Sequence, residues 1–186
     1  MTEHWCISDY HFYHKKLRLK YRLQWDSDDE MNEVMIQNTN ELVKRNDFLY
    51  FIGDFTWRNH GIKILERLNG QIFFIYGNHD KKTIINKLKN YKNIIWHGEQ
   101  KGIKIYGQKI FLNHYLMVSW NCCHWGSWHI HGHHHNPVPE EFYTGKVMNV
   151  GVDINDYKPI NFGQVKDYMK TRPDNWNLIR KKYKEK

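Results

Sequence analysis

Side chains that can bind metal ions recur at five places in the sequence, each directly after a short apolar run. The segments are Ser-Asp-Tyr-His at 8–11, Gly-Asp at 53–54, Gly-Asn-His-Asp at 77–80, Asn-His at 113–114 and His-Gly-His-His-His at 131–135. Aspartate, asparagine and histidine offer oxygen and imidazole nitrogen ligands without thiolates, and this mixture suits Mn²⁺, Fe²⁺ or Zn²⁺ better than Ca²⁺. The set is too large for one tetrahedral ion and suits two ions that share a carboxylate.

Each motif taken alone has a simpler interpretation. An aspartate after a strand is commonly a turn or capping residue, and a single loop histidine is usually polar surface. The histidine run at 131–135 could bind stray metal without any function. The joint occurrence of ligand types in all five segments favours a metal site.

Short apolar runs alternate with helical patterns along the chain, which is typical of an α/β arrangement. Open α/β sheets bind ligands at the carboxyl ends of their strands, so the five segments are expected to converge on one crevice. The glycines before Asp54, Asn78 and His133 are expected to make sharp turns that aim the next side chain inward. Strands are predicted at 5–8, 48–52, 72–76, 94–96, 103–106, 110–112, 128–131 and 147–150.

Helix signals lie between these strands. Ser27 and Glu30 predict a capping box before a helix that ends near residue 42. A second helix is expected over 62–68, and Asn161 with Gln164 predicts the cap of a last helix reaching about residue 170.

The composition indicates one compact domain. The chain has 186 residues, of which 40% are hydrophobic and 16% aromatic, so a real core can be buried. The sequence has no long uncharged apolar run of the kind that predicts a membrane span, and its N-terminus does not indicate a signal peptide. Three cysteines cannot all pair in disulfides. Together these features favour a cytoplasmic location. We predict a domain over 1–172 and a basic C-terminal tail over 173–186. The net charge of +8 points only weakly to an anionic partner.

In their order, the five segments resemble the signature blocks of the calcineurin-like metallophosphoesterases. Further similarity at 8–14, 113–115, 120–135 and 149–153 resembles a small single-domain branch of bacteria and phages, and it extends over about 5–160. The resemblance implies an α/β (α+β) fold, a four-layer αββα sandwich in which two central mixed β-sheets are flanked by helices. A bacterial cell or a phage-infected host is the corresponding setting.

The resemblance also implies which side chains hold two divalent ions, with Mn²⁺ expected first and iron, zinc or nickel as alternatives. One ion would take Asp9, His11 and His135. The second would take Asn78, His114 and His133, and Asp54 would bridge both.

The same resemblance assigns roles beside the ions. His79 would donate a proton to the leaving group, with Asp80 holding its ring, although capping of a helix over 81–88 is an equally open role for Asp80. His14 and His124 are candidate substrate contacts, with polar rim positions as the alternative. Arg58 is expected to be a surface residue.

These assignments predict a dinuclear metal-dependent phosphoesterase, in which hydroxide bridging the metals attacks phosphorus and His79 protonates the departing oxygen. The positive charge and the aromatic content favour a phosphodiester of a nucleotide or nucleic acid. The alternatives are a phosphomonoesterase acting on a small molecule or phosphoprotein, a catalytically inactive nucleic-acid-binding module of the same fold, and a metal-binding structural protein.

Overall fold

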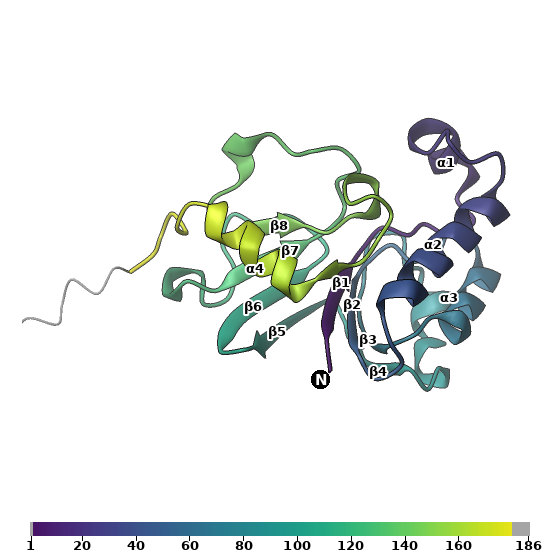
Figure 1. The fold of residues 1–186 in the computed structure, drawn as a ribbon, viewed down its shortest axis with the longest axis horizontal. Helices are drawn as coiled ribbons and strands as arrows, with labels where there is room; N and C mark the ends of the chain where they lie inside the picture. Colours follow the sequence, from purple (N-terminus) through teal and green to yellow (C-terminus); the bar gives the residue numbers. More distant parts are fainter. Residues whose placement is uncertain (1, 180–186) are drawn as a thin grey trace, which may run out of the picture.

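The computed structural model describes residues 2–179, which form two mixed β-sheets packed face to face (Figure 1). In the first sheet β1 to β4 are parallel and the short β9 runs antiparallel to β1. In the second sheet β6, β7 and β8 are parallel and β5 is antiparallel to β6. The strand order in the first sheet is β4 (Ile94–Gly98), β3 (Gln71–Ile75), β2 (Phe48–Ile52), β1 (His4–Ile7) and β9 (Ile160–Asn161). The strand order in the second sheet is β5 (Gln100–Ile105), β6 (Gln108–Asn113), β7 (Trp128–His131) and β8 (Val147–Asn149).

The helices lie on the outer side of the first sheet and at one edge of the sandwich (Figure 1). They are α1 (Lys15–Tyr21), α2 (Asp28–Leu42), α3 (Lys82–Ile85) and α4 (Phe162–Thr171), with 3₁₀ helices η1 (Asn59–Arg67), η2 (Leu88–Asn90), η3 (Cys123–Trp125), η4 (Glu140–Phe142) and η5 (Val152–Ile154).

Alternating strand residues build two separate cores. On β2, Leu49 and Phe51 face a core shared with α2 and η1, whereas Tyr50 and Ile52 face the second sheet. This alternation follows from the two-residue period of a strand, and it lets one strand hold both layers together. The predicted two-sheet sandwich is thereby confirmed.

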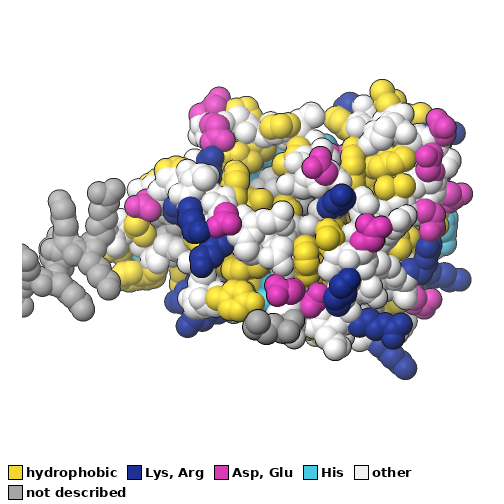
Figure 2. All heavy atoms as spheres, in the orientation of Figure 1, with side chains coloured by type: hydrophobic (Ala, Val, Ile, Leu, Met, Phe, Trp, Pro, Cys, Tyr) yellow, Lys and Arg dark blue, Asp and Glu magenta, His cyan; other side chains and the backbone are white. Residues whose placement is uncertain are grey.

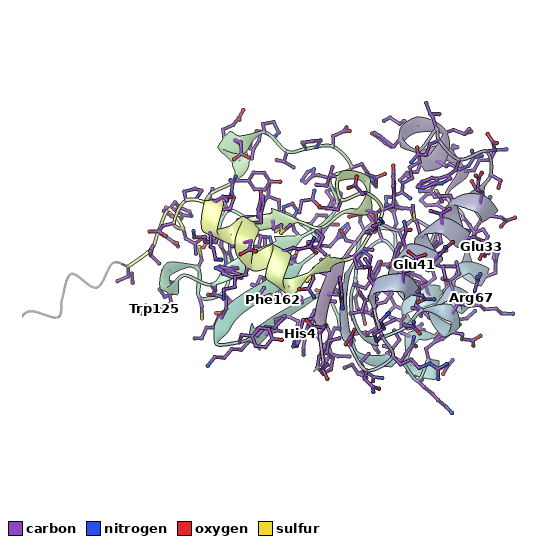
Figure 3. All side chains as sticks on the ribbon, in the orientation of Figure 1. His4, Glu33, Glu41, Arg67, Trp125 and Phe162 are labelled. Atoms are coloured by element: carbon purple, nitrogen blue, oxygen red, sulfur yellow. The ribbon has the colours of Figure 1, made fainter. Side chains whose placement is uncertain are left out.

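The cover of the second sheet differs from a simple helical layer. Phe111 and Val147 pack beneath Trp120 and Cys123, which belong to the irregular segment around η3. Helix α4 contacts β1, β8 and β9 and inserts Phe162 into the core between the sheets. Figure 3 shows Phe162 beside His4 of β1, and their ring centroids are 6.5 Å apart.

The two predicted helix starts have the expected caps. The Ser27 hydroxyl accepts from Glu30 N, while the Glu30 carboxylate accepts from Asp26 N, one residue earlier than a capping box requires. Asn161 and Gln164 form a complete capping box at α4.

Two predicted helices are shorter or tighter than expected. The segment 62–68 lies in the 3₁₀ helix η1, and the helix over 81–88 is reduced to the single turn α3 followed by η2. Gly61 in η1 and the β-branched run 83–85 in α3 both have low helix propensity, which accounts for the difference.

Residues 173–179, the described part of the predicted C-terminal tail, contact the domain. Asn175 is buried, and its amide donates to the carbonyls of Cys123 and Ser127. Ile179 N donates to the His124 carbonyl. The remaining part of the predicted tail, 180–186, lies outside the described residues. Among residues 2–179, no helix is both long and apolar enough to cross a membrane.

Parallel pairing places the predicted loops at one edge. Ile7 pairs with Phe51 and Ile52 with Ile75, so the loops after β1, β2 and β3 are neighbours. In the second sheet the carboxyl ends of β6, β7 and β8 are aligned in the same way. A bridge between Ser8 and Gly151 joins the two edges. The five segments therefore meet although they are far apart in sequence.

Candidate active site

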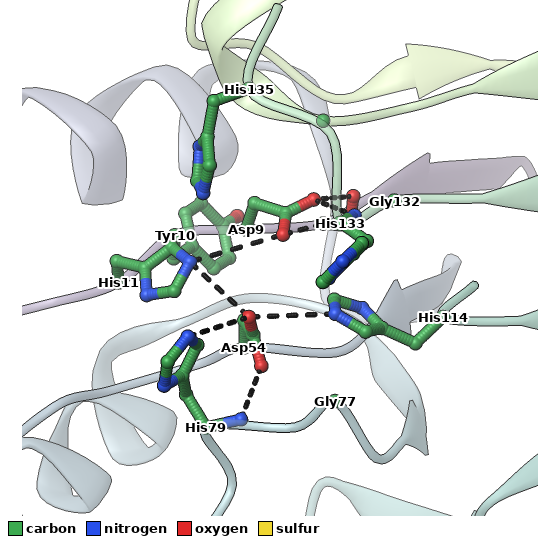
Figure 4. A network of polar contacts seen from close by, with 12 residues as sticks. Asp9, Tyr10, His11, Asp54, Gly77, His79, His114, Gly132, His133 and His135 are labelled. Atoms are coloured by element: carbon green, nitrogen blue, oxygen red, sulfur yellow. Dashed lines mark hydrogen bonds and ion pairs between the residues drawn. The ribbon is translucent and has the colours of Figure 1, made fainter. Parts of the chain in front are cut away.

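Two groups of side chains at this edge could each hold a metal ion (Figure 4). Asp9, His11 and His135 form the first cluster, and Asp54, His114 and His133 form the second. In each cluster the ligand atoms lie within 4.8 Å of one another. The family resemblance implies the same division of these side chains between two ions, with Asp54 shared and Asn78 added to the second set.

Asp54 lies between the two clusters. Its Oδ2 is 3.3 Å from His11 Nε2 and 3.4 Å from His114 Nε2, and its Oδ1 accepts from His79 N at 2.8 Å. Burial alone would raise the pKa of this carboxyl, but the imidazoles of His11 and His114 outweigh burial and hold the pKa well below its usual range. Asp54 is therefore an anion with one oxygen directed at both clusters.

Asp9 is a buried carboxylate whose shortest hydrogen bonds are both made by Oδ2. Its Oδ2 accepts from Ser8 Oγ at 2.6 Å and from His133 N at 3.0 Å. Burial raises the pKa of Asp9, because removing an anion from water without a full counter-charge is unfavourable. A cation beside Oδ1 would reverse that effect.

His11 has a buried nitrogen with no partner among the described residues. Its Nε2 makes no hydrogen bond, although Asp54 is near. Its Nδ1 is 3.4 Å from His14 Nδ1, so a proton donated there leaves Nε2 with a free lone pair. Burial lowers the pKa of His11 to about 3, so the ring is neutral. A neutral imidazole with an unpartnered nitrogen is suited to bind a metal ion.

The second cluster is oriented by backbone and amide groups. His114 Nδ1 lies 2.9 Å from the Ile52 carbonyl, which turns Nε2 toward Asp54. Asn78 Oδ1 lies 3.0 Å from both His114 Nε2 and His133 Nδ1, so the predicted ligand Asn78 belongs to this cluster. Burial disfavours the charged form of His114, but Asp54 and Asp9 outweigh it and raise its pKa to about 9.

A buried ion pair supports His135. His135 Nδ1 donates to Asp153 Oδ2 at 2.7 Å, and Arg22 binds both oxygens of Asp153 at 2.7 and 2.8 Å. Burial opposes ionisation of Asp153, but Arg22 and His135 outweigh it and lower its pKa to about 2. Arg22 is fully buried and also donates to the carbonyls of Asp9 and Tyr10. The pair thus orients His135 and fixes the loop after β1.

The sequence analysis did not identify this pair as functional. Asp153 belongs to the block 149–153 that contributed to the family resemblance, and that block was the available signal. Arg22 carries no local signal, because its partner Asp153 is 131 positions away in the sequence.

Exchanging Asp153 for Asn is expected to weaken metal binding at the first cluster about 10–100-fold, because outer partners of ligating histidines contribute that much to affinity. Titration calorimetry with Mn²⁺ should then show one weakened site and one unchanged site. Asp167→Asn, which removes an exposed partner of Lys170, is the matched control and should leave both sites unchanged. Equal weakening of both sites would contradict a local role for Asp153.

The backbone of the site loops is unusual. Asp9, His11, Asp54 and His133 all have positive φ angles, between 49° and 73°. Side-chain-bearing residues rarely adopt this conformation, and it concentrates where function requires a fixed geometry.

The glycines that precede the ligands do not all make turns as predicted. Gly53 does, with a φ of +88°. Gly77 and Gly132 instead permit close approach, since a Cβ on Gly77 would lie 2.5 Å from Asp54 N, and one on Gly132 would lie 2.5 Å from Asp9 Oδ2. A side chain at either position would occupy the space of a candidate metal ligand.

Gly77→Ala is therefore expected to lower catalytic efficiency about 100-fold, because small displacements of a reacting geometry have effects of this size. Gly102→Ala is the matched control, since a Cβ there meets nothing within 4 Å. Steady-state hydrolysis and thermal unfolding of both variants test this. A Gly77→Ala protein with wild-type kinetics would refute the close-packing argument.

His79 lies beside the clusters without belonging to either (Figure 4). Its Nε2 is 4.0 Å from Asp54 Oδ2, and its side chain is 38% exposed. An exposed imidazole next to the shared carboxylate is accessible to a substrate.

Asp80 has a different role from either one predicted for it. Its carboxylate accepts from the backbone nitrogens of Gly77, Asp54 and Phe55, at 2.8 to 2.9 Å. It makes no hydrogen bond to the His79 ring, and α3 has no side-chain cap. Asp80 thus fixes the loop after β3 to the loop after β2, because its buried oxygens need three nearby donors.

The two predicted substrate contacts have different positions. His14 lies near the clusters, stacked on Trp57 at 4.0 Å and with its ring 6.1 Å from that of His79. His124 belongs to η3, where its ring packs against Trp125, and among the described residues it contacts no member of either cluster. The carbonyl of His124 accepts a hydrogen bond from Ile179 N, and its role as a substrate contact stays a prediction. Arg58 is exposed, as expected.

Comparisons with known proteins agree with this fold. The chain is 34% identical over 170 residues to an uncharacterized protein of Methanocaldococcus jannaschii, covering 87% of this chain and 88% of that protein. A crystal structure of a protein of unknown function from Aquifex aeolicus matches with a TM-score of 0.72 and 27% identity, over 90% of this chain and 100% of the other. An archaeal phosphodiesterase matches with a TM-score of 0.51 and 22% identity, over 81% of this chain and 82% of that chain. No protein-family model matches.

The similarity to the archaeal phosphodiesterase, at 22% identity, shows the two-sheet fold alone. The chain belongs to the family of the Methanocaldococcus jannaschii protein, with which it shares most of its length.

Proposed function

We propose that this protein is a phosphoesterase that uses two divalent metal ions, and that phosphodiesters are its preferred substrates. The observation that carries the proposal is the position of Asp54, whose Oδ2 lies within 3.4 Å of a histidine from each cluster. One carboxylate oxygen between two sets of nitrogen and oxygen ligands is the arrangement of a two-metal phosphoesterase.

The side chains of the site fit such ions. His11 offers a buried nitrogen without a hydrogen bond, and Asp9 is a buried carboxylate whose pKa is raised by burial. The first ion would be held by Asp9, His11, Asp54 and His135, and the second by Asp54, Asn78, His114 and His133. Such ions, with Mn²⁺ proposed first, supply a water of lowered pKa and positive charge beside phosphate oxygens.

The protein's own residues account for the rest of the reaction. Asp54 holds the two clusters in register through Oδ2 and fixes the His79 backbone through Oδ1. His79, whose side chain is 38% exposed, is the proposed donor of a proton from Nε2 to the departing oxygen. Lys81, whose ammonium lies 5.2 Å from the centre of the Trp57 ring, adds positive charge on the same side.

The test uses protein stripped by a chelator and then supplied with Mn²⁺, Ni²⁺, Zn²⁺ or Mg²⁺. Bis(p-nitrophenyl) phosphate should be hydrolysed only after metal is restored, and faster than p-nitrophenyl phosphate. Turnover confined to the monoester would reverse the diester preference. Salt-sensitive binding of nucleic acid without hydrolysis in any metal would identify a non-catalytic binding module instead.

A further inference from the structure

A groove of about 640 Å³ opens beside the two clusters, and His133 and His135 line it. One wall is formed by Leu116 and Val118, after β6, and the other by residues 136–139 and Phe142, between β7 and β8. Tyr21 of α1 and His134 complete the lining. Volumes of about 300–1,000 Å³ are typical of sites for small organic molecules. Neither His79 nor Trp57 lines the groove, so it leads away from the side where a leaving group would be protonated.

The groove is apolar beyond the histidines at its inner end. Six of the eleven lining residues are leucine, valine, proline or phenylalanine, and none is Lys, Arg, Asp or Glu. The others are Tyr21, Asn136 and the histidines at 133–135. Val118 and Phe142 are 66% and 57% exposed, and Figure 2 shows hydrophobic side chains together with acidic ones along the upper edge of the molecule. The adjacent Glu140 is paired with Arg172 at 2.6 Å, outside the groove lining.

Hydrogen bonds and prolines hold the walls in place. The Val118 carbonyl accepts from Thr144 Oγ1 and from Trp176 Nε1, both at 3.0 Å. Pro137 and Pro139 restrict the opposite wall, because the proline ring fixes φ. A groove that is already formed loses little conformational entropy when a ligand enters. More of the free energy gained by burying apolar area therefore contributes to binding.

We propose that this groove binds the ester group that remains on phosphorus, and that this group is an uncharged, flat ring. The inference rests on the proposed function. On hydrolysis, a water oxygen bonds to phosphorus and releases one proton to solvent, and the bond from phosphorus to the leaving oxygen breaks. The proton on His79 passes to that oxygen, and His79 then regains a proton from solvent. The retained group stays on the His133 and His135 side, against aliphatic residues and the rings of Tyr21 and Phe142.

This assignment defines a substrate class. Small phosphodiesters with an aryl or nucleobase ring on the retained side fit an apolar groove, whereas a polyanionic backbone would need cations that the lining lacks. An aryl ring and a nucleobase offer the same flat, uncharged surface, and the experiment separates them.

Two esters with the same leaving group test the groove: phenyl p-nitrophenyl phosphate and methyl p-nitrophenyl phosphate. After correction for their relative rates in alkali, the wild type should prefer the phenyl ester about 10–100-fold in kcat/KM, the value of burying one ring. Phe142→Ser should reduce this preference about 10-fold. Leu23→Ser removes another exposed apolar side chain, outside the groove, and should keep the preference. Thymidine 5′-(p-nitrophenyl phosphate) then shows whether a nucleobase or a simple aryl ring is favoured.

Binding of the products supplies a readout independent of turnover. Phenyl phosphate should bind the wild type more tightly than methyl phosphate by calorimetry, and Phe142→Ser should remove the difference. Equal preference in wild type and Phe142→Ser, with p-nitrophenolate still released, overturns the groove and leaves the proposed function intact. If no ester releases p-nitrophenolate, the proposed function is contradicted. Calorimetry with phenyl phosphate and methyl phosphate then still tests whether the groove binds a ring. A dimer that Phe142→Ser dissociates in sedimentation would show a second copy of the chain on this face and overturn the inference.

Discussion

Asp54→Asn is expected to hydrolyse a phosphodiester at least about 10³-fold more slowly than the wild type in Mn²⁺, more than the 10–100-fold typical of an outer partner of a metal ligand. The substitution keeps the size of the side chain, and asparagine tolerates the φ of 62° at this position. It replaces the shared carboxylate by an uncharged amide, which does not offset the charge of two neighbouring cations. Both clusters lose charge at once, which no other single exchange in the site does.

The measurement pairs steady-state hydrolysis with metal content and thermal unfolding. Asp29→Asn, at an exposed position in the first turn of α2, is the control for loss of one negative charge. It should retain full activity and two bound ions. If Asp54→Asn and wild type turned over at the same rate, the shared-carboxylate site would be wrong.

His79→Gln has the second-largest expected effect, and its size should depend on the leaving group. For an unactivated alkyl leaving group, loss of the proton donor should lower kcat by about 10²–10⁴-fold. For p-nitrophenolate the loss should be much smaller, because that anion departs without a proton. Metal binding should be unchanged, since His79 is in neither cluster.

A series of diesters with leaving groups of rising pKa measures this dependence in wild type and variant. His60→Gln, which alters an exposed histidine packed on Tyr13, is the control and should follow the wild type throughout. A uniform loss across the series would indicate that His79 positions the phosphate rather than donating a proton.

Several assignments could be made from the sequence because they depend on local signals. The ligand types of Asp9, His11 and Asp54 and their places after apolar runs are visible in a few residues each. The family resemblance carried by the order of the five segments then implied two ligand sets, and the structure brings side chains of each set together. Strand periodicity and the capping box at Asn161 are local in the same way.

Other roles depend on partners that are distant in the chain. Asp80 stands at a position in the sequence that suits a helix cap. Its carboxylate oxygens instead accept hydrogen bonds from backbone nitrogens of the loop after β2, 25 and 26 positions earlier. The loop of His124, a predicted substrate contact, is likewise bound by the segment near Ile179, which is distant in the sequence. No local pattern encodes which of several available donors a buried carboxylate will meet.

The amino-acid sequence alone thus determined the alternation of strands and helices and the choice of oxygen and imidazole ligands, because both depend on side-chain chemistry and short periods. Only the tertiary structure decided that Arg22 and Asp153 orient His135, that Gly77 must lack a side chain, and that an apolar groove adjoins the clusters. Those features depend on distances between segments, which are set when the two sheets pack and their strand ends align.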